Sequence, residues 1–422
     1  MKKKGLPAIW AALAFILLLA RTGYAAPSSS GVTVAPEGGY QCDYGVDIPF
    51  TRSPRTGSYT FALYPGEGVA GTPEMTARVE VVPASQVNVH LPLQFDPAAP
   101  STWTLRVTTH AAPGREGLDR EASAVKTFTT KPACGCPAGT AGVYYAGAGT
   151  AQNPFLVATP GQLQHINTHL QGKHFKQARD IDLSSWGQWT PIGDFVTGVV
   201  SNPFTGFYDG DGKTITGCKI NGGFLRGSLF GCVSGPGAGV KDLSAQDFSI
   251  DVSGVKASDA GAIANYLRDG AAVSGCRVLG STISCQYSGA GVVAAIFEGG
   301  RVENCYADGN TVTGASVGGI TSWMEGDGTV KNCFSYSNRL ADTGGACGGI
   351  AANTYSGAPV LSGNFFLGTT ASCGGGNPAI NTGAAPITAG AFKNSSTFSG
   401  WDFSDVWYMP PDGDYPMLRC FS

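Results

Sequence analysis

The segment VENCYADGN at residues 302–310 is followed, after one short interval, by VKNCFSY at residues 330–336. The same kind of marker, an apolar residue followed three positions later by Cys, Leu or Gly, begins at Ile215, Val240, Val273, Val302, Val330 and Val360. A second, small-apolar-small motif is centred on residues 230, 263, 293, 320 and 350. A period of about 30 residues, with glycine turns and short apolar strands but no paired helices, is typical of the coils of a parallel β-helix, or β-solenoid.

The stacking of coils determines which of the repeated side chains are buried. One coil cannot bury its own inward side chains, so successive coils must stack, with equivalent residues about 4.8 Å apart. This arrangement predicts one inward ladder of Cys218, Cys276, Cys305 and Cys333, with Leu243 filling the missing position. Buried cysteine behaves as a small apolar residue, so packing is the favoured role; disulfides and a metal or redox site remain alternatives.

The composition agrees with a repeated all-β protein. The chain has 422 residues, 62 of them glycine, and 14% charged residues, against about 25% in typical domains. The formal net charge is −3, and after residue 30 no basic run is interleaved with aromatic residues. We therefore expect no nucleic-acid partner.

Residues 1–25 resemble a secretory signal peptide. Three lysines precede an apolar stretch over residues 9–20, and small residues follow at 23–26. The apolar stretch is shorter than the roughly 20 residues that span a bilayer. We expect an exported protein, whether secreted, at the cell surface or in the periplasm, with no membrane span after cleavage.

Residues 32–131 contain about seven short segments of alternating polar and apolar residues, separated by turn residues. This pattern predicts an N-terminal β-sandwich of the immunoglobulin or fibronectin type. A hinge rich in Cys, Gly and Pro follows at 132–148, and Cys134 or Cys136 is expected to form a disulfide there, with Cys42 or Cys420 as candidate partners. Metal binding by the hinge cysteines is the alternative.

The β-helix domain, predicted over residues 149–422, begins with one short helix. Thr159, Pro160 and Gln162 form an N-terminal capping signature, and Leu163, Ile166 and Leu170 form an apolar stripe. We expect this helix to cover the N-terminal end of the solenoid. His165 and His169 have a spacing that can hold zinc, but their angular positions predict a solvated helix face. The aromatic-rich segment 400–419 is expected to cover the last coil.

Two sets of carboxylates could carry chemistry. In DGDG, residues 209–212, Asp209 and Asp211 are predicted to form a turn rather than a calcium site, because no further ligands follow at the required spacing. Glu298 and Glu325 each follow a repeat marker by five residues, so they could stack about 5 Å apart, as in a retaining glycosidase. Asp308 and Asp327 are further candidates for such an enzyme.

Several segments resemble the GLUG-repeat β-helix family of secreted bacterial proteins. The resemblance rests on the GTAQNPF segment at 149–155, the DIDLSSWGQWTPIG segment at 180–193, the NPFTGFYDGDGKTITGCKI segment at 202–220, the two quoted repeats and the C-terminal GWDFSDVWYMPPDGDYPMLR. It implies an adhesin-like, surface-exposed role. The same repeats accompany metalloproteases with a His-Glu-x-x-His motif, but this chain has no His-Glu pair, so that activity is not expected.

These observations together predict a non-enzymatic exported protein that presents a β-helix surface to a glycan or protein on a host or neighbouring cell. No catalytic residue, cofactor or metal is assigned. The alternative is a polysaccharide lyase or hydrolase on the same scaffold, with Glu298 and Glu325 as its carboxylates.

Overall fold

The computed structural model describes residues 33–36, 44–51, 56–73, 75–80, 86–93, 102–111, 123–129, 132–137, 140–196, 199–368 and 383–422. The chain divides into two compact units, residues 1–132 and 133–422. The predicted signal peptide and Cys42 lie outside the described residues. No helix in the described part of the chain is long and apolar enough to cross a membrane.

The first unit consists of two antiparallel sheets. One has the order β1 (Thr33–Pro36), β2 (Tyr44–Thr51), β5 (Gln86–Leu93), and the other has the order β4 (Met75–Glu80), β3 (Thr56–Pro65), β6 (Thr102–Ala111), β7 (Ser123–Thr129). Strand β6 shows the predicted alternation, with Trp103, Leu105 and Val107 buried. The packing of the two sheets as a sandwich, and its superfamily, stay predictions.

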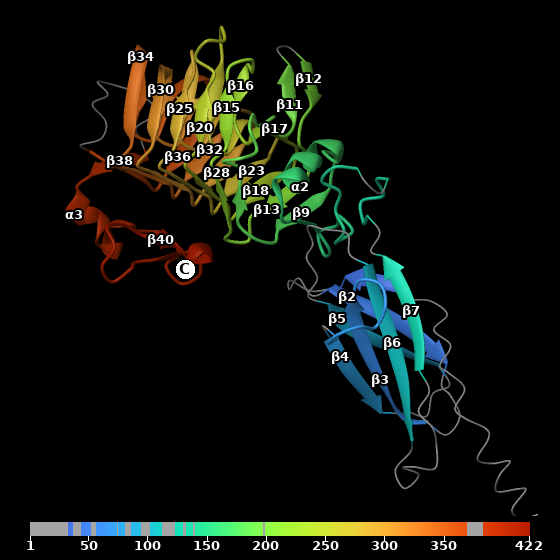
Figure 1. Cartoon of the computed structure of the whole chain (residues 1–422). Coiled ribbons are helices and arrows are strands. Elements are labelled where there is room, and N and C mark those ends of the chain that lie inside the picture. Colours follow the sequence, from blue (N-terminus) through green and yellow to red (C-terminus); the bar gives the residue numbers. More distant parts are fainter. Residues whose placement is uncertain are drawn as a thin grey trace, which may run out of the picture. The chain divides into compact units, whose positions relative to one another are not determined.

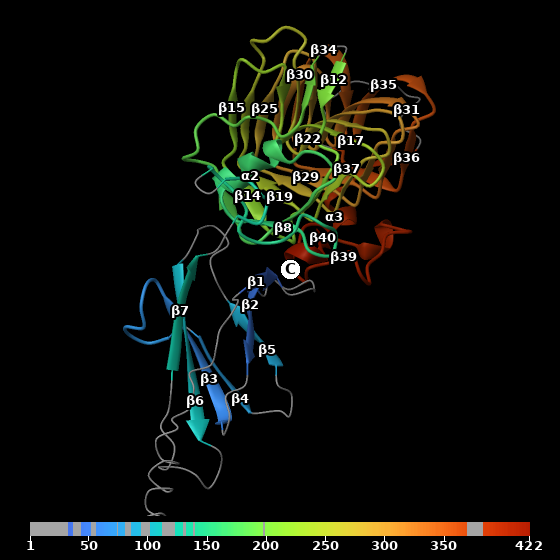
Figure 2. The ribbon, with the colours of Figure 1, turned by 90° about the vertical axis from the view of Figure 1, so that its right-hand side faces the viewer.

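The second unit is a parallel β-solenoid of about six coils, as the repeat period predicts. Its coils stack side by side from the green to the orange part of the chain (Figures 1 and 2). The first sheet has the order β36 (Val360–Ser362), β32 (Thr329–Lys331), β28 (Arg301–Glu303), β23 (Ala272–Ser274), β18 (Gly239–Lys241), β13 (Phe207–Asp209), β9 (His174–Gln177), β8 (Phe155–Val157). The second has the order β10 (Ile181–Asp182), β14 (Thr214–Thr216), β19 (Ser244–Gln246), β24 (Arg277–Leu279), β29 (Tyr306–Asp308), β33 (Phe334–Tyr336), β37 (Asn364–Leu367), β38 (Ala384–Ile387).

Two further sheets complete each coil. The third has the order β15 (Lys219–Asn221), β20 (Ser249–Asp251), β25 (Thr282–Ser284), β30 (Thr311–Gly318), β26 (Ser288–Ala290), β21 (Asp259–Gly261), β16 (Arg226–Gly227), with β34 (Arg339–Gly348) paired to β30. The fourth has the order β17 (Phe230–Ser234), β22 (Ala264–Arg268), β27 (Val293–Ile296), β31 (Thr321–Gly326), β35 (Ala351–Gly357). Strands β11 (Asp194–Val196) and β12 (Val199–Asn202) form a hairpin.

Parallel register explains why the marker motif repeats. Val273, Val302 and Val330 pair in neighbouring coils and are fully buried. The residue before each ladder cysteine is in the left-handed region: Gly275 at φ 62°, Asn304 at 52° and Asn332 at 53°. Gly and Asn tolerate that conformation better than other residues do, so the marker encodes a sharp corner followed by an inward side chain.

The predicted cysteine ladder is confirmed for three of its four members. Cys276, Cys305 and Cys333 have no exposed surface, and the backbone N–H groups of Cys276 and Cys305 each donate to the sulfur of the next cysteine at 3.4 Å. Cys218 is fully buried but belongs to a different ladder. Ile215 pairs with Ala245 rather than Val240, which puts Cys218 level with Phe248. The Asp-Gly-Asp-Gly turn lengthens the corner before β14. The marker that ends at Cys218 therefore falls at the next corner, between the second and third sheets, whereas the other markers lie between the first and second sheets.

Thiol labelling tests the ladder. Cys276, Cys305 and Cys333 are expected to stay unmodified in native protein and to react only after denaturation, because their sulfurs point into the core. Cys305→Ser is expected to lower the unfolding free energy by about 1–3 kcal/mol, since it removes apolar contact and buries a hydroxyl. Mass spectrometry of alkylated peptides would measure the labelling. Rapid native modification of all three would contradict the assigned register.

The N-terminal helix is confirmed where it was predicted. It comprises α2 (Pro160–His165) and the 3₁₀ turn η1 (Ile166–Thr168), capped by Thr159, whose Oγ1 accepts from the Gln162 N–H at 3.2 Å. The Gln162 side chain accepts from the Ala158 N–H at 2.9 Å, which completes the cap. Leu163 and Ile166 are fully buried in the solenoid core, so the helix covers the first coil at its N-terminal end.

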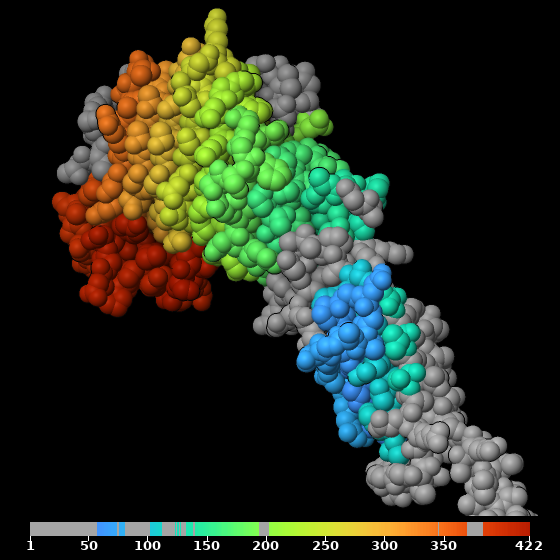
Figure 3. Space-filling view, in the orientation of Figure 1, coloured from blue at the N-terminus to red at the C-terminus, as the bar shows by residue number. Residues whose placement is uncertain are grey.

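The predicted position of the C-terminal segment is wrong. This segment, which contains α3 (Ala389–Phe392), η3 (Ser395–Thr397), β39 (Trp407–Tyr408), β40 (Met417–Leu418) and η4 (Arg419–Phe421), does not lie over the end of the last coil. It runs back along the outer face of the second sheet, and Figure 3 shows it in red against the side of the solenoid. Trp407 and Leu418 pack there with Tyr306 and Phe334. The second sheet instead ends with β38, which pairs with β37.

Candidate functional site

The outer face of the fourth sheet carries a row of aromatic side chains. Tyr266, Ala295 and Trp323 occupy equivalent positions in β22, β27 and β31. Strand alternation points these residues outward, because Ile296 and Met324, their chain neighbours, are fully buried in the core. The row therefore lies on the outer side of the sheet and crosses several coils. Tyr266 and Ala295 are covered there, at 8% and 3% exposed, whereas Trp323 is half-buried.

Three of the aromatic residues form the most exposed part of the row. Tyr287 and Tyr355 are 47% and 72% exposed, and Trp323, which is half-buried, lies between them. The Trp323 ring centroid is 5.7 Å from that of Tyr355 and 6.1 Å from that of Tyr287. Tyr287 belongs to the turn before β26, a strand of the third sheet. It reaches Trp323 of the fourth sheet only because successive coils are stacked.

Polar side chains surround this aromatic row. Glu325 is two residues after Trp323 on the same face of β31, and its carboxylate accepts from the Ser356 hydroxyl at 3.3 Å. Arg268 lies over the Phe297 ring at 6.0 Å and is 3.7 Å from Glu298. The face thus combines apolar rings with hydroxyl and paired charged groups.

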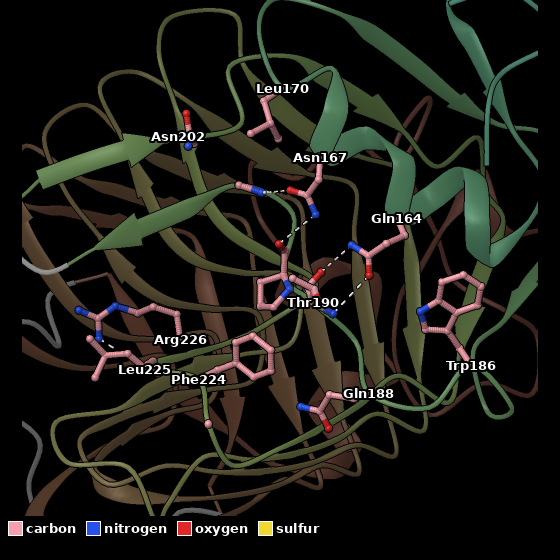
Figure 4. A pocket seen from close by; sticks show the side chains of 13 residues that line it. Gln164, Asn167, Leu170, Trp186, Gln188, Thr190, Asn202, Phe224, Leu225 and Arg226 are labelled. Atoms are coloured by element: carbon pink, nitrogen blue, oxygen red, sulfur yellow. Dashed lines mark hydrogen bonds between the residues drawn. The ribbon is translucent and has the colours of Figure 1, made fainter. Parts of the chain in front are cut away.

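A pocket of about 800 Å³ lies at the N-terminal end of the solenoid, beside α2 (Figure 4). Trp186 and Arg226 lie at opposite sides of it, with Phe224 between them, and Trp186 is 40% exposed. Two of its amide side chains bond to backbone. Gln164 pairs with the carbonyl and N–H of Thr190, and Asn167 with the carbonyl of Pro191 and the N–H of Gly193. These bonds fix the pocket wall.

A buried ion pair connects the pocket to the aromatic row. The Arg226 guanidinium donates to Asp259 at 2.7 Å, and Tyr266 donates to the same carboxylate oxygen at 2.9 Å. The Arg226 guanidinium also lies 4.5 Å from the centroid of the Tyr266 ring. Burial raises the pKa of Asp259, and the positive charge of Arg226 opposes that rise. The inner end of the row is therefore fixed by charge-assisted bonds.

The predicted stacking of Glu298 and Glu325 is wrong. Val293 pairs with Thr321 rather than with Ile320, and Ile296 pairs with Met324. This shift by one residue puts Glu298 level with Gly326 and Glu325 level with Phe297. The two carboxylates therefore do not occupy equivalent positions, and each has its own partner, Arg268 for Glu298 and the Ser356 hydroxyl for Glu325.

The other predicted carboxylates also have separate partners. Asp308 accepts from the Tyr415 hydroxyl at 2.6 Å, and Asp327 accepts from the Gly299 N–H. The predicted corner at the Asp-Gly-Asp-Gly segment is confirmed, since Asp209 accepts from the Asp211 N–H at 2.9 Å. Lys241 and Lys176 pair with Asp209 and Asp211, each at 3.0 Å.

Two predictions about the hinge and the helix are corrected. His165 is buried and His169 is half-buried, so this helix face is not solvated. Cys134 and Cys136 are free thiols rather than disulfide partners, and Cys420 is also free. The entry segment, residues 133–137 and 140–146, folds over the helix and buries the face that helical periodicity assigned to solvent.

Comparisons with known proteins find partial similarity. The chain is 36% identical over 124 residues, 27% of its length, to a protein of Evansella cellulosilytica named "Putative Gly-rich membrane protein". It is 33% identical over 111 residues, 25% of its length, to "Halomucin" of Haloquadratum walsbyi. The matches cover 13% and 1% of those relatives. No protein-family profile and no solved structure matches the chain.

Proposed function

We propose that this protein is an exported, non-enzymatic, adhesin-like protein that binds glycan chains along the outer face of the fourth sheet. The observation that carries the proposal is the row of Tyr287, Trp323 and Tyr355 across neighbouring coils. Tyr and Trp supply rigid contact area with an apolar ring and a polar end, which suits a sugar's C–H groups and hydroxyls. Exposed aromatic patches in soluble proteins commonly mark interaction sites.

An elongated ligand fits this surface better than a compact one. The row extends from coil to coil, and a chain of repeated sugar units can contact successive coils in the same way. The Glu298 and Glu325 charges have partners at the surface, and the chain carries few charges in all. We therefore favour an uncharged glycan. A protein ligand remains an outcome of the test below.

Export is supported by several features. The N-terminal sequence has the features of a signal peptide, Cys347 is disulfide-bonded, and one similar protein is named as a membrane protein. Disulfides persist mainly in oxidising compartments outside the cytoplasm. Membership of the GLUG-repeat family stays a proposal that rests on the quoted motifs.

Binding to a panel of polysaccharides and to protein ligands, with the chain lacking residues 1–25, tests the function. Trp323→Ala and Tyr355→Ala are each expected to weaken glycan binding about tenfold, which corresponds to roughly 1.4 kcal/mol, without changing the unfolding temperature. Trp186→Ala, in the separate pocket, is the matched control and should bind normally. Affinity electrophoresis or calorimetry gives the measurement.

Other outcomes would point elsewhere. Binding only to proteins, with the same loss in Trp323→Ala, would identify the face correctly and the ligand class incorrectly. Loss of binding in Trp186→Ala alone would move the site to the pocket. Shortening of a polysaccharide during incubation, abolished by Glu325→Gln, would support the alternative of a polysaccharide lyase or hydrolase.

A further inference from the structure

Four metal-ligating side chains meet where the chain enters the solenoid unit. Cys134 and Cys136 come from the entry segment, and His165 and His169 come from the end of α2 and the residue after η1. Their ligand atoms all lie within 4.8 Å of one another. Among the residues that the structure describes, this is the group of three or more Cys, His, Asp or Glu side chains that could hold a metal ion.

The distances between these atoms fit one tetrahedral ion. Cys136 Sγ is 3.5 Å from His165 Nε2 and 3.4 Å from His169 Nε2, and Cys134 Sγ is 3.8 Å from His165 Nε2. Zinc bonds of about 2.3 Å to sulfur and about 2.0–2.1 Å to nitrogen place S and N ligands ~3.6 Å apart at the tetrahedral angle. The four atoms are already near the corners of such a site.

The protein holds these ligands by contacts that need no metal. The Ala133 N–H donates to the Tyr144 carbonyl at 2.6 Å, the Tyr144 hydroxyl donates to the Gln162 carbonyl at 2.9 Å, and Gln162 Nε2 donates to the Val143 carbonyl at 3.2 Å. The Tyr144 ring packs edge-on against His165, with centroids 5.3 Å apart. The entry segment is therefore bonded to the helix at Gln162 and packed against His165, beside the cluster.

Close backbone contact adds a further constraint. Gly142 has φ 71°, and a Cβ at that position would lie 2.0 Å from the Gly161 carbonyl oxygen. Only glycine at 142 lets the entry segment pass this close to the start of the helix. The cysteines are thus held against the histidine face.

The ligand set indicates the kind of metal and its role. Two thiolates and two imidazoles suit zinc, whereas calcium and magnesium prefer oxygen ligands. The charge of Zn²⁺ would balance two thiolates. Four protein ligands also complete the tetrahedral coordination shell, so no position is left for a substrate or reactive water. Such a closed site stabilises structure instead of carrying out catalysis.

We propose that Cys134, Cys136, His165 and His169 bind one structural Zn²⁺, which fastens the entry segment of the solenoid unit to its N-terminal helix. This site is independent of the glycan-binding face, so either assignment can fail without the other. Metal binding at the first coil would stabilise the end at which the stack begins.

Metal analysis of the chain lacking residues 1–25 tests the proposal. Protein purified in zinc-containing buffer is expected to hold about one Zn²⁺ per chain. Replacement by Co²⁺ should give the visible bands of tetrahedral cobalt and a thiolate-to-cobalt charge-transfer band in the near ultraviolet. Chelation should lower the unfolding temperature and speed alkylation of Cys134 and Cys136, and added zinc should reverse both effects.

Variants distinguish this site from adventitious binding. Cys136→Ser and His169→Asn are each expected to weaken zinc binding by at least about 100-fold, more than the loss of a supporting residue costs. Cys420→Ser and His174→Asn, matched changes outside the cluster, should retain the metal. If a ligand variant fails to fold, the cobalt spectrum and chelation of the unaltered chain still decide the question. A Cys134–Cys136 disulfide in the purified protein, or substoichiometric zinc unaffected by either ligand variant, would overturn the proposal.

Discussion

Deletion of residues 400–422 is expected to convert the protein into self-associating species that keep β-type circular dichroism but unfold at a lower temperature. The segment buries Trp407 completely and leaves Trp401 only 7% exposed, against the outer face of the second sheet. The Tyr306 and Phe334 rings on that face are stacked, with centroids 4.7 Å apart. Deletion would expose this aromatic face to water and to other molecules.

Removal of a single buried side chain of this segment is also expected to lower the stability of the protein strongly. Trp407 contacts the rings of Tyr306, Phe334 and Trp401. Trp407→Ala is therefore expected to lower the unfolding free energy by about 3–5 kcal/mol, the range for large buried aromatic residues. Denaturant unfolding would measure it.

A matched variant of the truncated protein distinguishes association through the exposed aromatic face from association through the open end of the solenoid. The truncation with Tyr306→Thr and Phe334→Thr is expected to regain a monomeric state, because those outward positions then become polar. Light scattering would follow association. Persistent association of the substituted truncation would indicate that open strand edges, rather than the aromatic face, cause it. A monomeric simple truncation of undiminished stability would contradict the role of the segment.

Asp259→Ala is expected to lower the unfolding free energy by about 3–5 kcal/mol, since it leaves the Arg226 charge buried without its carboxylate. The side chains of Arg226 and Asp259 are only 9% and 7% exposed. Asp259 also accepts bonds from the Tyr266 hydroxyl and from the Ser288 N–H, so the substitution removes several bonds together. Urea unfolding gives the measurement.

The exposed pair of Lys393 and Asp414 is the control for this prediction. Their atoms are 2.8 Å apart, but the side chains are 55% and 61% exposed. Asp414→Ala is expected to cost no more than about 1 kcal/mol, the upper range for surface ion pairs. An effect of Asp259→Ala as small as that of the control would show that the buried pair does not stabilise the native protein.

Much of the solenoid could be predicted because its code is local and repeated. An apolar residue, two corner residues and an inward Cys recur in successive coils, and the left-handed φ of Asn304 and Asn332 explains why the corner residue is Asn. The predicted helix cap at Thr159 followed from an equally short motif. In both cases neighbouring residues alone carry the information.

Register was predictable only approximately. The markers at Cys218, Val293 and Val360 each depart from the structural repeat. Thr329, not Val330, pairs with Val360, so Val360 is 49% exposed instead of buried. Such shifts of position separated Glu298 from Glu325 and removed Cys218 from its expected ladder.

The sequence by itself determined the repeat, the inward ladders and the corner residues, because each depends on contacts within a coil or between equivalent positions of successive coils. Only the tertiary structure decided which surfaces meet. It placed the entry-segment cysteines beside His165 and His169, brought Tyr287 next to Trp323, and laid the C-terminal aromatic segment along a sheet face. The physical reason is that these contacts join segments without a common period, so their partners depend on how the chain packs beyond the repeat.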